Sequence, residues 1–76
     1  MSDKNPPEKT FRIGRLSATI WRNEGQDGRE FYNAEIVRNY TDKDGKWKTT
    51  SSFKHDELLS VAMLAERAEQ FIAELG

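Results

Sequence analysis

The chain has 76 residues, a net charge of −1 and no cysteine. This length predicts one small domain, and the absence of cysteine excludes disulfides and thiolate metal sites. No stretch is long or apolar enough for a signal peptide or a membrane span, so we expect a cytoplasmic protein without a membrane partner.

The charges are divided unevenly along the chain. Residues 1–54 carry 11 Lys and Arg against 8 Asp and Glu, a net +3, whereas residues 55–76 carry a net −4. Such a division steers a polyanion toward one side of a molecule, or simply holds the two parts together.

Residues 1–9 contain two prolines and no apolar period, which predicts an extended tail before a single domain of residues 10–76. A period of two around Ala18 predicts a strand within residues 10–22. Phe11 and Ile13 are out of phase with this period, and Gly14 marks the change. A bulge or bend at Gly14 is one interpretation, and a short separate strand before it is the other.

Two further strands are predicted over residues 29–40 and 46–53, each preceded by a turn sequence that contains Asp and Gly. Antiparallel neighbours point to the same face, so we expect Ile20 opposite Tyr32 and Tyr40 opposite Trp47. In this register one face holds Leu16, Ala18, Ile20, Tyr32, Ala34, Ile36, Tyr40, Trp47 and Phe53.

The last element is an amphipathic helix from His55 to about Leu75, with a broad apolar face that covers this side of the sheet. The predicted fold is therefore α+β, a three-stranded antiparallel meander with a C-terminal helix (β-β-β-α). Leu59 and Met63 fall outside the apolar face, either as partial covers of the helix shoulder or as partner contacts.

The face of the sheet opposite the helix is where we expect function. Trp21 and Phe31 should lie side by side on it, near Val37, with cations and hydroxyl groups around them. Aromatic rings stack on unpaired bases and cations contact phosphates, so this face suits single-stranded nucleic acid. The alternatives are a contact with a second subunit, which a bare sheet face often makes, and ordinary surface packing.

Arg38 falls on the helix side, where it either contacts a phosphate at the sheet edge or pairs with a helix carboxylate such as Glu69. Catalysis has little support. His55 is the only histidine, and it precedes Asp56 and Glu57 in directions that diverge around a helix start. We therefore expect no enzyme activity, no catalytic residue, no metal, no cofactor and no small-molecule substrate.

Two resemblances follow from particular motifs. The runs Ile13–Trp21, Arg38–Tyr40, Asp44–Lys48 and Ser52–Leu58 resemble a family of short bacterial proteins of uncharacterised activity. More distantly, Tyr40, the turn from Asp42 to Gly45, the lysine-bearing strand and the run from Ser52 to Glu57 resemble the Whirly proteins and the single-stranded-DNA-binding transcriptional coactivators. Those proteins have a meander, usually of four strands, followed by a helix, and they dimerise.

Together, the residues and the second resemblance predict a homodimer that binds single-stranded nucleic acid without enzymatic activity. The predicted nucleic-acid contacts are Arg15, Thr19, Trp21, Arg38, Lys46 and Lys48. The predicted dimer contacts are Trp21, Phe31, Val37, Leu59 and Met63. The alternative function is a protein-interaction or scaffold homodimer whose open sheet face is the interface.

Overall fold

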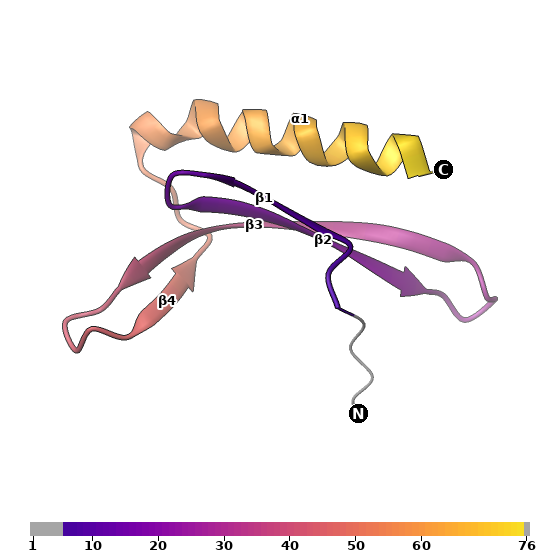
Figure 1. Cartoon of the computed structure of the whole chain (residues 1–76), viewed down its shortest axis with the longest axis horizontal. Coiled ribbons are helices and arrows are strands. Elements are labelled where there is room, and N and C mark those ends of the chain that lie inside the picture. The colour runs from indigo at the N-terminus through magenta and orange to yellow at the C-terminus, as the bar shows by residue number, and fades with distance from the viewer. Residues whose placement is uncertain (1–5, 76) are drawn as a thin grey trace.

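The computed structural model describes residues 6–75, which form a four-stranded antiparallel sheet followed by a helix (Figure 1). The strands are β1 (Lys9–Ile13), β2 (Leu16–Glu24), β3 (Glu30–Thr41) and β4 (Trp47–Thr50), in the spatial order β1-β2-β3-β4. A short 3₁₀ turn, η1 (His55–Glu57), leads into α1 (Leu58–Leu75). The predicted α+β class, the antiparallel meander and the C-terminal helix are confirmed.

The predicted number of strands is wrong, because the first predicted strand is a hairpin. Gly14 has φ +58° and begins a two-residue turn that brings Ile13 opposite Leu16. This positive φ suits glycine at the first central position of a type II′ turn. Phe11 consequently lies opposite Ala18. The change of phase in the sequence therefore marks a chain reversal, and the separate strand is the correct interpretation.

The register of β2 and β3 differs by two residues from the prediction, since Ile20 lies opposite Ala34 rather than Tyr32. The turn between these strands explains the shift. The amide of Gly25 donates to the carbonyl of Arg29 at 2.8 Å, and Gly28 takes φ +82° in the three-residue loop between them. A shift of two residues preserves the side-chain alternation, so the face assignment of both strands is correct.

The register of β3 and β4 differs by a single residue, and this changes the face. Tyr40 lies opposite Lys48 rather than Trp47. The side chain of Asp42 accepts hydrogen bonds from the amides of Asp44 at 2.9 Å and Lys46 at 3.0 Å, which closes a short turn. A one-residue shift moves every side chain of a strand to the other face, so Trp47 does not lie under the helix.

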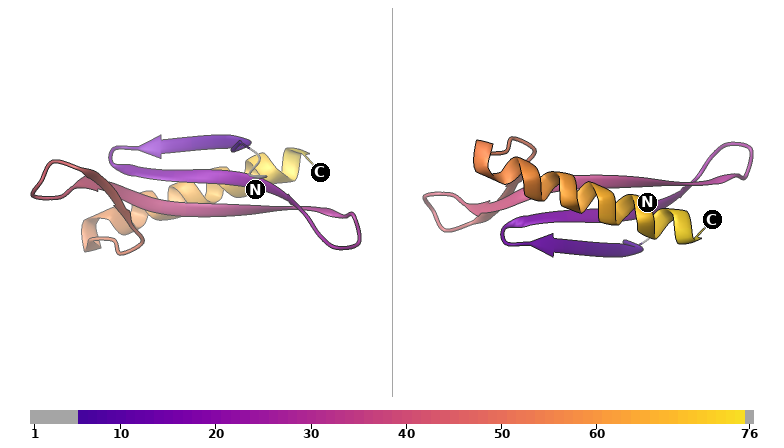
Figure 2. Two further views of the ribbon diagram at one scale, coloured as in Figure 1. Left: turned by 90° about the horizontal axis from the view of Figure 1, so that it is seen from below. Right: turned by 90° about the horizontal axis from the view of Figure 1, so that it is seen from above.

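The helix packs on β1, β2 and β3 and, within residues 6–75, makes no contact with β4; it runs obliquely across the sheet (Figure 2). Phe11 and Phe71 meet edge to face with their ring centroids 6.1 Å apart. Phe53 follows β4 instead of belonging to it and packs beside the core. The buried apolar side chains are Leu16, Ala18, Ile20, Leu64 and Ala68.

The N-terminal segment joins the sheet earlier than the sequence indicates. Lys9 is the first residue of β1, and the amide of Glu8 donates to the carbonyl of Ile20 at 2.8 Å. Residues 1–5 of the predicted tail and Gly76 lie outside the described residues.

The burial of Ala18 gives a test of the packing. This side chain is fully buried, so Ala18→Asp would place an unpaired carboxylate in the core. That costs several kcal/mol, comparable with the whole stability of a small domain. We expect circular dichroism to show an unfolded chain. Thr49→Asp, on an exposed strand position, should stay within about 0.5 kcal/mol of wild type. A native melting curve for Ala18→Asp would contradict this packing.

Candidate nucleic-acid interface

The sheet is arched. Its two ends, formed by the β2–β3 and β3–β4 hairpins, bend away from α1 (Figure 1). The face opposite α1, called the open face from here on, is therefore concave. Strand registers assign to it the residues that alternate with the helix-side residues. They are Thr10, Arg12, Ser17, Thr19, Trp21, Asn23, Phe31, Asn33, Glu35, Val37, Asn39, Thr41, Trp47 and Thr49.

Trp47 is the most exposed aromatic residue of the open face. It lies opposite Thr41, and 73% of its surface is accessible. Tryptophan is enriched at interfaces, so an indole ring this exposed marks a candidate contact site. The predicted register, which differs by one residue, placed Trp47 in the core. The signal that was missed is Asp42, whose side chain selects the shorter turn.

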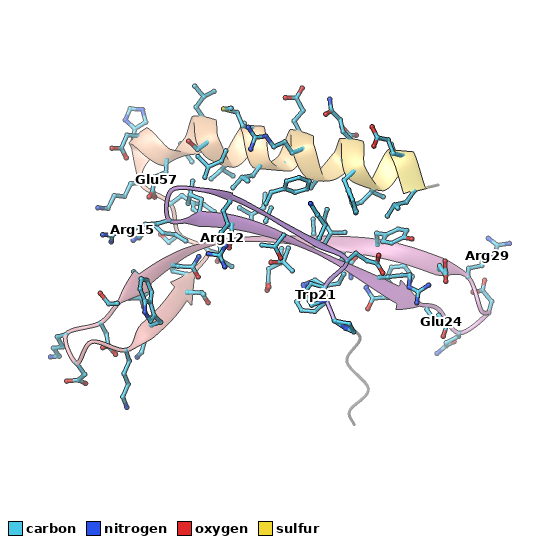
Figure 3. All side chains as sticks on the ribbon, viewed as in Figure 1. Arg12, Arg15, Trp21, Glu24, Arg29 and Glu57 are labelled. Carbon is cyan, nitrogen blue, oxygen red and sulfur yellow. The ribbon has the colours of Figure 1, made fainter. Side chains whose placement is uncertain are left out.

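Two arginines come from the β1–β2 hairpin (Figure 3). Arg15 is in the row of Asn39, toward the end where Trp47 lies, whereas Arg12 is in the row of Val37, halfway between the rows of Trp47 and Trp21. The amide of Asn39 donates to the carbonyl of Arg15 at 2.8 Å, and its side-chain Nδ2 donates to the same oxygen at 3.2 Å. These bonds hold the β1–β2 turn against β3 and place the exposed Arg15 in line with the open-face residues of β2. Arg12 lies opposite Ser17 and is also exposed. Arg12 is not among the predicted contacts, because the three-stranded prediction gave residues 9–13 no face of their own.

Trp21 lies toward the other end and on the open face, as predicted. It is opposite Asn33 and diagonal to Phe31, whereas the predicted register placed it directly opposite Phe31. The rows of Trp47 and Trp21 are separated by eight residues of β3, from Thr41 to Asn33. At the rise of a β-strand this corresponds to about 26 Å along the sheet.

Thr19 occupies the middle of the open face, as predicted, and is opposite Glu35. The open face therefore has aromatic rings at both ends. Between the rows of the two tryptophans lie Arg12 and one carboxylate, that of Glu35. This arrangement favours a phosphate backbone near Arg12 and Arg15 and opposes one near Glu35.

The two lysines predicted to project from the open face do not do so. Lys48 lies on the helix side of β4, and its Nζ is 3.5 Å from a carboxylate oxygen of Asp42. Lys46 belongs to the turn that precedes β4, and its amide is bonded to Asp42. The prediction for this pair fails for the same reason as that for Trp47, namely the one-residue register shift.

Arg38 lies on the helix side, so the sheet separates it from Thr19 and Trp21. Its Nε lies 3.3 Å from Oε1 of Glu57, and its Nη2 donates to the carbonyl of Ser52 at 3.4 Å. The Nε–H is not directed at an acceptor, so the contact with Glu57 is a charge pair rather than an aligned hydrogen bond. Only about a fifth of either side chain is exposed, at 20% and 21%. Of the two alternatives for Arg38, pairing with a carboxylate on the helix side is the correct one, and the partner is Glu57 instead of Glu69.

The five predicted dimer contacts do not form one surface. Trp21, Phe31 and Val37 lie on the open face. Leu59 and Met63 lie on α1, on the other side of the sheet, where 76% and 43% of their surfaces are exposed. A single flat contact with a second subunit cannot include both groups.

Within residues 6–75 there is no group of three or more His, Cys, Asp or Glu side chains that could hold a metal ion. None of the helices described is long and apolar enough to cross a bilayer. Comparisons with models of protein families, with curated proteins and with solved structures find no match to this chain.

The role of Glu57 can be tested through stability. Its Oε1 accepts a hydrogen bond from the amide of Lys54 at 2.8 Å and lies beside Arg38. Glu57→Ala removes this N-terminal cap and leaves the guanidinium without its carboxylate, so we expect unfolding free energy to fall by about 1–3 kcal/mol. Urea unfolding measures the change. Glu66→Ala, at an exposed helix position, should alter stability by no more than about 0.5 kcal/mol. If Glu57→Ala and Glu66→Ala lower the unfolding free energy equally, Glu57 has no special structural role.

Proposed function

We propose that the open face binds single-stranded nucleic acid. In this proposal Trp47 and Trp21 stack on bases, while Arg12 and Arg15 contact phosphates. The observation that carries the proposal is the indole of Trp47, 73% exposed on a concave strand face that also carries Trp21 and Arg12.

The ligand is single-stranded because the open face offers rings rather than a projecting element. Reading a duplex usually requires a helix or a β-ribbon that enters a groove. A sheet with exposed rings instead binds bases that are already unpaired, and each stacked base contributes roughly 1–3 kcal/mol. The amide of Asn33, opposite Trp21, and the hydroxyl of Thr49, between the rows of the two tryptophans, are available to base edges.

The resemblance to Whirly proteins and to the transcriptional coactivators supports the same proposal. Its implication of a four-stranded meander before a helix agrees with the order of β1, β2, β3, β4 and α1. The resemblance also implied Lys48 and Arg38 as binding residues, but both pair with carboxylates on the helix side. The proposed binding residues are therefore those of the open face.

Stacking and charge can be separated by titrating labelled single-stranded oligonucleotides at several salt concentrations. Trp47→Ala should weaken binding by roughly 1–3 kcal/mol, about 5-fold to 150-fold, and leave the salt dependence nearly unchanged. The double change Arg12→Ala with Arg15→Ala should instead flatten the dependence of log affinity on log salt. For a single strand, the slope should decrease by roughly 0.7 for each phosphate that the variant no longer neutralises.

The matched control for the arginines is Lys48→Ala, which removes one positive charge from the helix side of β4. We expect it to leave the salt slope unchanged within error. Absence of binding to any oligonucleotide at low salt would end the proposal. If Lys48→Ala changes the salt slope and the arginine variants do not, the phosphates contact the β3–β4 hairpin instead of the β1–β2 hairpin.

Glu35 provides a test in the opposite direction. Its exposed carboxylate lies on the open face between the rows of Trp21 and Trp47, where it repels a passing phosphate. Glu35→Gln should strengthen binding by about twofold to fivefold at low salt, because it removes a surface repulsion of up to about 1 kcal/mol. The gain should disappear at high salt. An isothermal titration that shows weaker binding for Glu35→Gln would place the ligand on another face.

A further inference from the structure

One side of β3 is free over much of its length. β4 pairs only with the residues from Arg38 to Thr41, whereas β2 pairs with β3 from its first residue to Arg38. Within the part of the chain that the structure describes, no strand lies beside residues 31–37 on the side away from β2. The free edge is closed at one end, where Thr50 lies opposite Arg38 and the carbonyl of Ser52 accepts a hydrogen bond from the Arg38 side chain. A strand that joins this edge must therefore be short.

The backbone groups on this edge are directed outward. The amide of Asn39 donates to the carbonyl of Arg15, next to β2, so the odd-numbered residues of β3 direct their backbone groups to β2. Alternation in an antiparallel pair then directs the N–H and C=O groups of Tyr32 and Ala34 toward the free edge. Extended peptides add to such edges through main-chain hydrogen bonds.

The free edge of β3 lacks the charges that the outer strands of the sheet carry. β1 contains Lys9 and Arg12, and β4 contains Lys48. Lysine and proline on an edge discourage pairing with other strands, and residues 31–37 contain no Lys, Arg or Pro. The free part of β3 is therefore the edge of this sheet that is most open to another strand.

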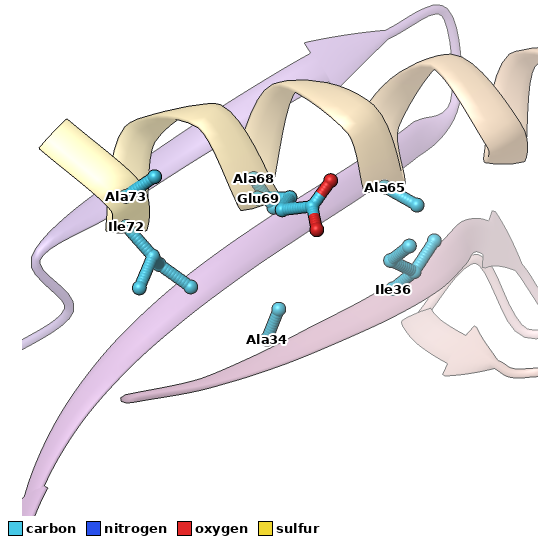
Figure 4. A pocket seen from close by; sticks show the side chains of 7 residues that line it. All are labelled: Ala34, Ile36, Ala65, Ala68, Glu69, Ile72 and Ala73. Carbon is cyan, nitrogen blue, oxygen red and sulfur yellow. The ribbon is translucent and has the colours of Figure 1, made fainter. Parts of the chain in front are cut away.

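An apolar depression of about 510 Å³ lies above this edge, between β3 and α1 (Figure 4). Ala34, which the sequence analysis assigned to the core, is exposed in it. Small side chains at Ala34, Ala65 and Ala73 leave room for one long side chain from outside the chain. The lining residues are Ala34, Ile36, Ala65, Ala68, Glu69, Ile72 and Ala73.

Glu69 is the one charged residue of this lining, and its carboxylate is exposed beside the apolar side chains (Figure 4). Among the described residues it forms no ion pair, whereas Glu57 pairs with Arg38 and Glu30 pairs with Arg22. Lysine and arginine side chains lay their alkyl stems along apolar surface and keep the charged group in water. An apolar depression with a carboxylate beside it therefore fits the stem and the charged group of one basic side chain.

We propose that this edge binds a short extended segment of another protein, which runs antiparallel to β3 and places an arginine or lysine in the depression. The second residue of the segment lies opposite Ala34 and carries the cation, whose partner is Glu69. The fourth residue lies opposite Tyr32 and is β-branched, a favourable partner for an aromatic ring across two strands. Both side chains are on the helix side, because directly opposite residues of an antiparallel pair share a face.

The position of β4 selects a short segment over a second copy of β3. A segment of about five residues, opposite Phe31 to Glu35, ends before the ladder between Thr50 and Arg38 begins. A second β3 paired in the same way would continue with its β2–β3 hairpin into the place of β4. The proposal does not depend on nucleic-acid binding, since Trp47, Trp21 and Arg12 belong to other strands.

A blocked peptide of sequence Thr-Arg-Thr-Val-Thr tests the pairing, with its arginine opposite Ala34 and its valine opposite Tyr32. In a nuclear magnetic resonance titration of the full chain we expect a Kd of about 1 mM or tighter. The amides of Tyr32 and Ala34 should show the largest shift changes and slower hydrogen exchange. N-methylation of the arginine amide removes its hydrogen bond to the Ala34 carbonyl and should raise the Kd about tenfold or more. N-methylation of the central threonine, whose N–H points away from β3, is the matched control and should change the Kd less than about twofold.

The charge of Glu69 gives the second readout. Glu69→Lys should raise the Kd of the arginine peptide by about tenfold and should strengthen binding of the peptide Thr-Glu-Thr-Val-Thr. Glu74→Lys makes the same charge change at an exposed position about 140° around the helix and should leave both Kd values within about twofold. Circular dichroism checks that both variants are folded, and the N-methylated peptides test the pairing on the unaltered chain.

Several outcomes would overturn the proposal. One is the absence of a saturable shift change at about 1 mM arginine peptide. Another is an equal loss of affinity for the two N-methylated peptides, and a third is a shift pattern centred on Trp47 and Arg12. If the amides of Tyr32 and Ala34 are protected without peptide and lose this protection on dilution, a second copy of the chain occupies the edge instead.

Discussion

The bonds made by one carboxylate, that of Asp42, determine which side chains of β4 reach the open face. By accepting the amides of Asp44 and Lys46, Asp42 closes the β3–β4 turn with one residue fewer than the apolar pattern suggests. The side-chain period of a strand is two, so this single residue exchanges the faces of β4. It exposes Trp47 on the open face and turns Lys48 toward the helix side.

The placement of the helix separates the structural from the functional surfaces. Because α1 packs on β1, β2 and β3 without reaching β4, the core is small and lies mainly between α1 and the β1–β2 hairpin. The cost of this arrangement is an apolar strand edge at Ala34 that the chain does not cover. Exposed strand edges of this kind pair readily with other strands unless charge, a bulge or a covering segment prevents it.

The sequence by itself determined the properties that depend on local periodicity. Alternation along β2 and β3 assigned Trp21 and Thr19 to the open face, and the apolar period after His55 located the helix. Only the tertiary structure decided the positions that depend on how one element meets another. The faces of Trp47 and Lys48, the pairing of Arg38 with Glu57 and the exposure of Ala34 all follow from register and from helix placement. A shift of one residue leaves the composition and period of a strand unchanged, so turn hydrogen bonds and cross-strand packing alone select among the registers.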